Sequence, residues 1–218
     1  MRLPKIQNYK NEKDIEVVKL KDIDKATRDI ILITEKEKVK FIKTAERIIR
    51  SSQEYKDYIA YLRTNIDMTE CSFFKNINNK DYRKISIDIH HEPFTLFDIT
   101  QAVLNKYLLT NKEVNYFKIA EEVMKLHYQG KVGLIPLSAT VHQLVGEGKL
   151  FIPLQNVYGN FIEFLEEYEP FISEDVKDIL QIKLKMSKEL QEPDMTILEK
   201  KYVYLEVDGF SFPQVIEK

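Results

Sequence analysis

The segment KISIDIHHEPFTLFDI, Lys84 to Ile99, decides the fold expected for this chain. Its first half alternates isoleucine with polar residues, which is the pattern of a half-buried strand. Pro93 should end the strand, and Thr95 is placed to cap a following helix. The segment therefore predicts a strand that leads directly into a helix, with the adjacent histidines His90 and His91 at the strand end.

The composition is typical of a globular protein with one large domain or two small ones. The chain has 218 residues, of which 44% are hydrophobic. Its single cysteine, Cys71, excludes an internal disulfide and any CxxC zinc knuckle, so the cytoplasm is the default location. The formal net charge of -2 gives no global attraction to nucleic acid. Any DNA contact would have to come from a local basic patch.

No part of the sequence predicts export or membrane insertion. The first residues, MRLPKIQNYKNEKD, lack the apolar core of a signal peptide. No apolar run approaches the roughly 18 residues that span a bilayer. We therefore expect no membrane partner.

Hydrophobic periodicity predicts a mostly helical chain around the strand. After a strand-like segment at 16–20, an apolar stripe indicates either one long helix or two helices joined near Ser51 and Ser52. The stripe contains Phe41, Ala45, Ile48, Ser52, Tyr55, Ile59 and Leu62. Further helices are expected at 95–109, 113–128, 139–145, 161–168 and 174–190, and short strands at 132–137 and 150–154. The tail alternates like one or two strands with a turn at Asp208 and Gly209. These elements predict an α+β fold.

Three residues mark the ends and the interior of the predicted helices. His127 continues the apolar stripe of the 113–128 helix, so we interpret it as a core histidine with one hydrogen bond rather than a ligand. Gly130 is expected to end that helix, and Ser138 to cap the next one.

The histidines have the chemistry that metal-dependent phosphodiester hydrolysis requires. Such a reaction needs a general base that takes a proton from water and a cation that neutralises charge on the phosphate. Adjacent histidines at a strand end point in different directions, so one can hold an ion while the other works as the base. His142, at the edge of a predicted helix, is a rigid source of a further ligand.

The sequence IDIHHEP followed by GLIPLSATVHQLV resembles the HNH nuclease family, in particular its colicin-type DNase branch. That family's ββα-metal motif has a strand ending in His-His or Asp-His, a second strand, and a helix with the metal-binding histidine. The resemblance implies that His91 is the general base and that His90 and His142 bind a divalent ion, namely Mg, Mn, Zn or Ni. It covers about 85–153, and its wider context is similar to phage-encoded members.

A basic segment precedes the histidine pair. The stretch CSFFKNINNKDYRK is polar and rich in asparagine, so we expect a loop. Its position makes phosphate contact the functional interpretation of four basic residues, and a solvated loop is the alternative. These residues are Lys75, Lys80, Arg83 and Lys84.

The chain departs from the HNH pattern in several places. Gly133 stands where many members have a bracing asparagine, and Ser138 and Val141 stand where zinc-knuckle members have cysteines. Gly146 stands where the colicin-type pattern has its second helical histidine. Glycine there either ends the helix or replaces a lost ligand, and because Gly148 can end the helix we interpret it as a lost ligand.

Together these features predict a mostly helical α+β chain with a small ββα-metal unit that carries a helical insertion. The expected regions are 1–80 (helical), 81–158 (the HNH-like unit) and 159–218 (helices and strands). The expected function is that of a metal-dependent DNA endonuclease from a phage or mobile element, with DNA as partner. The alternative is a noncatalytic virion, packaging or host-interaction protein with a degenerate HNH fold, partnered by other phage proteins and located in the virion.

Overall fold

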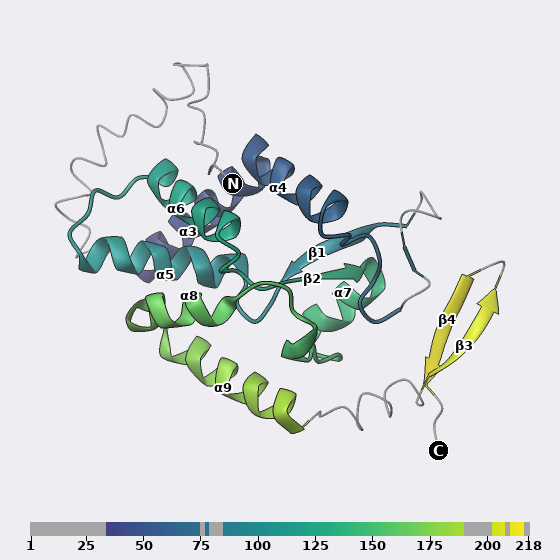
Figure 1. Ribbon diagram of the computed structural model, residues 1–218. Helices are drawn as coiled ribbons and strands as arrows, with labels where there is room; N and C mark the ends of the chain where they lie inside the picture. Colours follow the sequence, from purple (N-terminus) through teal and green to yellow (C-terminus); the bar gives the residue numbers. More distant parts are fainter. Residues whose placement is uncertain (1–33, 75–76, 79–84, 190–201, 208–209, 216–218) are drawn as a thin grey trace. The chain divides into compact units, whose positions relative to one another are not determined.

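The computed structural model describes residues 34–74, 77–78 and 85–189 in full, and the backbone of 202–207 and 210–215. In these ranges the chain forms seven α-helices and two small two-stranded sheets, which confirms the mostly helical α+β class (Figure 1). The helices are α3 (Glu35–Ser51), α4 (Gln53–Thr64), α5 (Leu96–Leu109), α6 (Tyr116–Tyr128), α7 (Ala139–Gly146), α8 (Phe161–Tyr168) and α9 (Glu174–Glu189). The strands are β1 (Ile87–His91), β2 (Leu134–Ser138), β3 (Tyr202–Val207) and β4 (Phe210–Val215). The predicted strand at 16–20 lies outside the described residues.

The chain divides into two compact units whose segments interleave along the sequence. The first unit comprises Met1–Tyr58, Phe94–Val132 and Asn160–Val176, and the second comprises Ile59–Pro93, Gly133–Gly159 and Lys177–Lys218. This grouping differs from the consecutive regions expected from the sequence, because α5 and α6 belong to one unit while β1 and β2 belong to the other.

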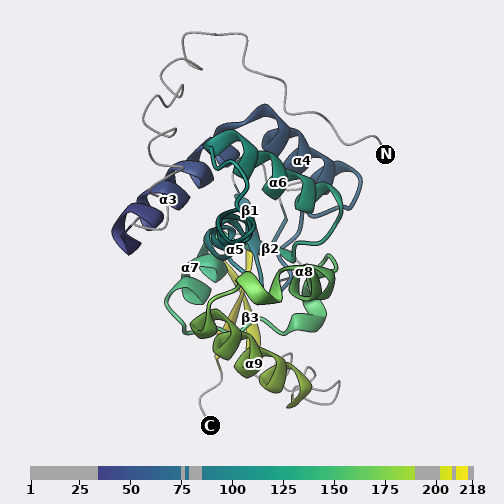
Figure 2. The same cartoon turned by 90° about the vertical axis from the view of Figure 1, so that its left-hand side faces the viewer.

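The helices of the first unit pack around α5. Figure 2 shows α5 nearly end-on, with α3 and α6 on one side and α8 on the other. Thr95 begins α5 with a capping box, as predicted: its hydroxyl accepts the N–H of Asp98, and the Asp98 carboxylate accepts the N–H of Thr95. Apolar side chains such as Ile49, Val103 and Val123 are fully buried and form the core of this unit.

Ser52 separates α3 from α4, so the two-helix alternative for the N-terminal stripe is the one observed. Its extended backbone, with φ -66° and ψ 152°, stops α3. The buried Ser52 hydroxyl donates to the carbonyl of Ile49 at 2.7 Å and accepts the N–H of Tyr55 at 3.1 Å. One small polar side chain thus satisfies the end of one helix and the start of the next.

Gly130 ends α6, as predicted. Its φ of +69° lies in the left-handed region that glycine adopts without strain. The N–H groups of Gly130 and Lys131 bond to the carbonyls of His127 and Leu126 at 2.9 and 3.0 Å, which is the Schellman arrangement. Gly148, with φ +68°, ends α7 in the same way.

His127 is a core histidine, as predicted. Its side chain is 1% exposed, and its Nδ1 lies 2.7 Å from the carbonyl oxygen of Val123. The rings of Tyr55 and Tyr58 meet it edge to face. Burial lowers the pKa of His127 from 6.5 to about 4, against the opposite influence of the hydrogen bond to Val123, and the charge of Arg50 lowers it further. The imidazole is therefore neutral at physiological pH.

The buried His127 should make the fold sensitive to mild acid. Below its unfolded pKa of 6.5 the unfolded chain binds a proton that the folded chain binds only near pH 4, so stability falls as the pH falls through this window. At pH 5 the loss relative to pH 7.5 should be about 2 kcal/mol larger in the wild type than in His127→Met. Urea unfolding of both proteins across this range measures the difference. Parallel pH profiles would contradict the assignment.

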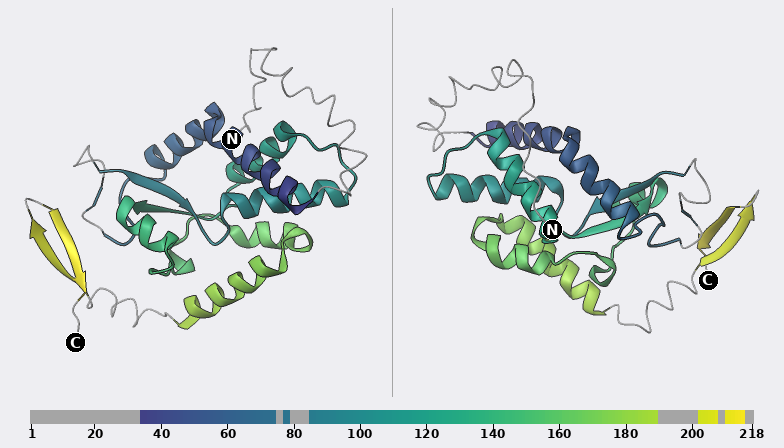
Figure 3. Two further views of the ribbon diagram at one scale, coloured as in Figure 1. Left: turned by 180° about the vertical axis from the view of Figure 1, so that it is seen from behind. Right: turned by 45° about the horizontal axis from the view of Figure 1, so that its top comes forward.

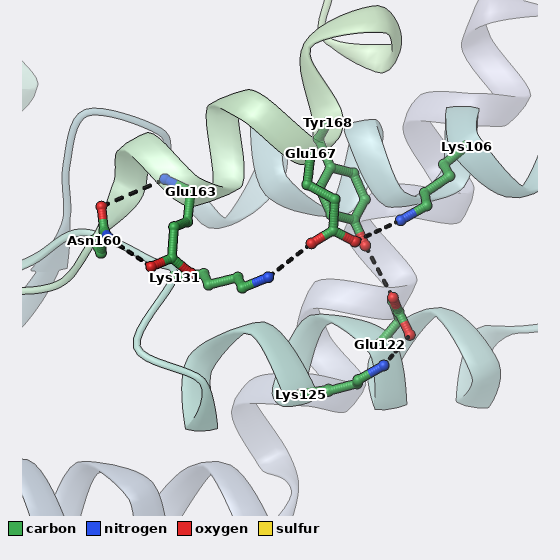
Figure 4. Close-up of polar contacts among 8 residues, drawn as sticks. All are labelled: Lys106, Glu122, Lys125, Lys131, Asn160, Glu163, Glu167 and Tyr168. Atoms are coloured by element: carbon green, nitrogen blue, oxygen red, sulfur yellow. Dashed lines mark hydrogen bonds and ion pairs between the residues drawn. The ribbon is translucent and has the colours of Figure 1, made fainter.

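A polar network holds α8 against the rest of the first unit. The Glu167 carboxylate accepts from Lys106 at 2.8 Å and from Lys131 at 2.9 Å (Figure 4). These two ammonium groups lower the pKa of Glu167 to about 2. The neighbouring Tyr168 is fully buried, donates its hydroxyl to Glu122 at 2.9 Å, and has Lys106 over its ring at 4.0 Å. The ion pairs of Glu167 and the burial of Tyr168 therefore both stabilise the packing of α8 in the first unit.

The second unit contains the predicted ββα arrangement. Strands β1 and β2 pair antiparallel, from Ile87 opposite Ser138 to His91 opposite Leu134, and α7 follows β2 directly (Figure 3). The sequence between the two strands contains α5 and α6, as expected. The core of the unit consists of Cys71, Ile77, Ile87, Ile135, Leu137, Val141 and Ile152. The backbone of β1 and the start of α7 are thus held on one apolar cluster.

Two local predictions for the second unit are wrong. Residues 150–154 do not form a strand: Leu154–Asn156 is a 3₁₀ helix, and Leu134 of β2 pairs instead with Tyr158 in an isolated bridge. Pro153 has no N–H for a strand ladder, which disfavours the predicted pairing. Ser138 does precede α7, but its side chain makes no cap hydrogen bond, and among the described residues its buried hydroxyl has no partner.

The last described strands, β3 and β4, pair antiparallel, so the two-strand alternative for the tail is the one observed. Their register runs from Tyr202 opposite Val215 to Val207 opposite Phe210. Among the helices that the structure describes, none has the length and apolar character that a membrane span requires.

Candidate functional site

His90 and His142 come together at one face of β1, although they are far apart in sequence. Their ring centroids are 4.9 Å apart, in an edge-to-face arrangement. Asp88 lies two residues before His90 and therefore on the same face of the strand. The Nδ1 of His142 lies 3.1 Å from Oδ2 of Asp88, so the imidazole donates and the carboxylate accepts. Helix α7 is tied to β1 by this contact.

A buried ion pair lies beside the histidines. The Glu92 side chain is 6% exposed, its Oε1 lies 2.6 Å from Nζ of Lys183, and its Oε2 lies 3.7 Å from Nε2 of His90. Lys183 also donates to the carbonyl of Pro93 at 3.1 Å. The same ammonium group therefore holds α9 to the end of β1 at two points. We call Asp88, His90, Glu92, His142 and Lys183 the strand-end cluster.

His91 differs from its neighbour in environment. It is 4% exposed and follows His90 in the strand, so the alternation of side chains places it on the opposite face. Strict alternation along 85–91 of the sequence predicts the apolar side of the strand for His91. A general base has to reach the proton that it removes, directly or through one water. Burial on the face away from His142 does not offer that access.

The two glycines that depart from the HNH pattern have different structural roles. A Cβ on Gly133 would lie 1.8 Å from the backbone oxygen of Glu92 and 2.7 Å from Cγ1 of Val157, so glycine is required for this close approach. A Cβ on Gly146 would have nothing within 4 Å. Gly148 ends α7, as inferred from the sequence. Position 146 has room for a side chain.

The remaining predictions for the site are not tested by the described residues. Lys75, Lys80, Arg83 and Lys84 all lie outside them. Within the described ranges no group of three or more His, Cys, Asp or Glu side chains is arranged to hold a metal ion. The described residues do not test the divalent ion expected from the sequence, so that ion stays a prediction.

Sequence reasoning missed three members of the strand-end cluster. Asp88 and Glu92 are each two residues from His90, and this spacing is a signal that the strand alternation already contains. Lys183 is 90 residues from Pro93, to which it donates, and no local pattern points to it. Each carboxylate of the cluster has a partner within it: Glu92 pairs with Lys183, and Asp88 accepts from His142.

Comparison with known proteins overturns the HNH assignment. No curated protein and no solved structure matches the chain. A family model described as Bacteriophage G278-like virion protein matches residues 3–209, nearly the whole sequence, and no HNH family matches. The HNH resemblance covered only about 85–153, so the nuclease and hydrolase interpretation built on it was wrong. The chain belongs to the Bacteriophage G278-like virion protein family.

Proposed function

We propose that this virion protein is a noncatalytic structural component, held in the phage particle by contacts with other phage proteins. The observation that carries the proposal is the pairing of Glu92 with Lys183 at the strand end. The sequence pattern predicted a reactive centre beside this pair, at His90, His91 and His142. Its buried carboxylate joins α9 to β1, and Asp88 joins α7 to the same strand through His142.

The burial of His91 supports the same proposal. A reactive imidazole needs access to substrate, whereas this side chain is 4% exposed on the apolar face of a strand. The first unit also contains a carboxylate that joins separate segments of the chain: Glu167 forms ion pairs with both Lys106 and Lys131. Such networks favour a fixed shape, which an assembly component requires.

A complementation experiment tests the proposal. A phage lacking the gene would be supplied in trans with the wild-type chain or with the double variant His90→Gln/His142→Gln. Glutamine keeps a donor for Asp88, and the exposed His142–Asp88 pair contributes little stability, so the variant should fold. We expect purified particles to contain wild-type and variant chains equally and to be equally infectious. Circular dichroism of the purified variant checks the fold.

Two results would contradict the structural role. Particles that contain the variant in normal amount but have lost infectivity would indicate chemistry at His90 and His142. Infectious particles from which the wild-type chain is absent by mass spectrometry would show that it is not a structural component.

A further inference from the structure

The outer face of helix α3 carries a row of positive charge. The buried residues Ile42, Ala45 and Ile49 define the side of the helix that packs in the first unit. On the opposite side, cationic residues spaced four, three and four apart are all exposed. We call these residues the basic row: Lys36, Lys40, Lys43 and Arg47. At 1.5 Å of rise per residue the row is about 16 Å long.

The carboxylates of α3 have partners outside the basic row. Glu35 pairs with Lys38 at 2.6 Å, Glu46 pairs with Arg50 at 3.9 Å, and the Glu37 carboxylate accepts the N–H of Thr34 at 2.9 Å. Among the described residues, none forms an ion pair with a member of the row. The charge of the row is therefore not neutralised within that part of the chain.

The basic row differs from an ordinary solvated helix face. Helix α6 exposes Lys118, Glu121 and Lys125 at the same spacing but with alternating sign, which is typical of such a face. In the basic row each step brings two like charges together, and like charges at this spacing destabilise a helix. The net charge of the chain is -2, so a general excess of basic residues does not account for the row. A partner with negative charge would offset the repulsion.

The shape of the positive region indicates which polyanion fits. Glu37 and Glu46 lie on either side of the basic row, each about 60° around the helix from its nearest member. The positive region is thus a line and not a broad surface. A nucleic-acid strand offers a line of phosphates, about 3.4 Å apart along the helix axis. An anionic membrane presents charge over a plane, which would bring its headgroups against both carboxylates.

A protein partner fits the basic row less well. Protein interfaces are depleted in lysine and depend on buried aromatic or apolar anchors. The row consists of three lysines and one arginine, with no apolar member. Lysine and arginine side chains on one face of a helix are instead the typical footprint of phosphate binding.

We propose that the basic row binds the phosphate backbone of a nucleic acid, without sequence preference. Contacts to phosphate position a protein on nucleic acid but do not read base edges. The proposal goes beyond the structural role proposed above, because it adds a nucleic-acid partner, which a phage particle contains as its genome. It does not depend on that role, since the purified chain should bind by itself.

Fluorescence anisotropy with a labelled DNA duplex of mixed sequence tests the proposal on the full chain. At about 50 mM salt the double variant Lys40→Gln/Lys43→Gln should bind about a hundredfold more weakly, because each phosphate contact contributes roughly tenfold at this salt concentration. The slope of log K against log salt should become shallower by about two. Lys40→Arg/Lys43→Arg keeps both charges and should bind as the wild type does.

The double variant Lys185→Gln/Lys188→Gln is the matched control. Both lysines are exposed on α9, and the change in net charge is the same. It should weaken binding less than about twofold, because these lysines lie outside the basic row. Urea midpoints check the folds, and that of Lys40→Gln/Lys43→Gln should not fall, since the substitutions remove repulsion between exposed side chains.

Vesicles test the choice of polyanion. Cosedimentation with vesicles of phosphatidylcholine, with and without phosphatidylserine, should show much weaker binding than the duplex at the same salt concentration. Vesicle binding as tight as duplex binding would overturn the choice of nucleic acid.

Three further results would overturn the proposal. These are a chain that does not bind the duplex, binding that does not weaken with salt, and equal losses from Lys40→Gln/Lys43→Gln and the α9 control. Each would leave the structural role standing if the chain is present in purified particles. Absence from the particles would remove the structural role, and duplex binding by the basic row would still stand on its own measurement.

Discussion

Gly133→Ala should destabilise the chain by at least about 3 kcal/mol. The added Cβ would lie 1.8 Å from the backbone oxygen of Glu92, a separation that no side-chain rotation relieves. The Glu92 N–H also bonds to the Gly133 carbonyl at 3.0 Å, so moving the two segments apart breaks this hydrogen bond. Urea unfolding measures the loss, and a variant that is unfolded on purification is the extreme form of the same result.

Gly146→Ala is the matched control for this substitution. Gly146 is the last residue of α7, has free space around its Cβ position, and does not adopt a positive φ. Alanine there should stabilise the chain by up to roughly 0.5–1 kcal/mol, because alanine loses less backbone entropy in a helix. A cost for Gly133→Ala no larger than about 1 kcal/mol would mean that the strands adjust easily, against the close packing inferred here.

Features that depend on neighbouring residues were predictable from the sequence. Thr95 caps α5, Gly130 ends α6 and His127 is buried because each is determined within about one helical turn. The strand alternation placed His91 on the buried side for the same reason. The choice between one helix and two at Ser52 stayed open, because it depends on hydrogen bonds of a single buried hydroxyl.

Features that depend on distant contacts were not predictable. Residues 150–154 have the composition of a strand, but the residue that bridges to Leu134 of β2 is Tyr158, which lies beyond them in the chain. Two adjacent histidines and a third on a helix suggested a nuclease, yet the same ββα geometry here belongs to a virion protein family. A fold unit of this size does not determine an activity.

Lys183→Met should cost about 3 kcal/mol of unfolding free energy, because it leaves the buried Glu92 carboxylate without its partner. Methionine keeps the length and apolar stem of lysine, so the loss reports on charge and hydrogen bonding rather than on packing. It also removes the donor to the carbonyl of Pro93. Lys188→Met, at an exposed position of the same helix, should change stability by no more than about 0.5 kcal/mol.

The double variant Glu92→Gln/Lys183→Met tests whether Glu92 and Lys183 stabilise the fold as a pair. Glutamine is neutral, so burying it without a cation costs far less than burying a carboxylate, and the double variant should recover most of the stability that Lys183→Met loses. Glu92→Gln alone should lose less than Lys183→Met alone, because the amide oxygen still accepts from the ammonium group. A double-mutant cycle in urea gives the coupling free energy, which should exceed about 1 kcal/mol for groups in direct contact. Additive losses would mean that Lys183 stabilises α9 independently of Glu92, and the strand-end cluster would then not be the element that joins α9 to β1.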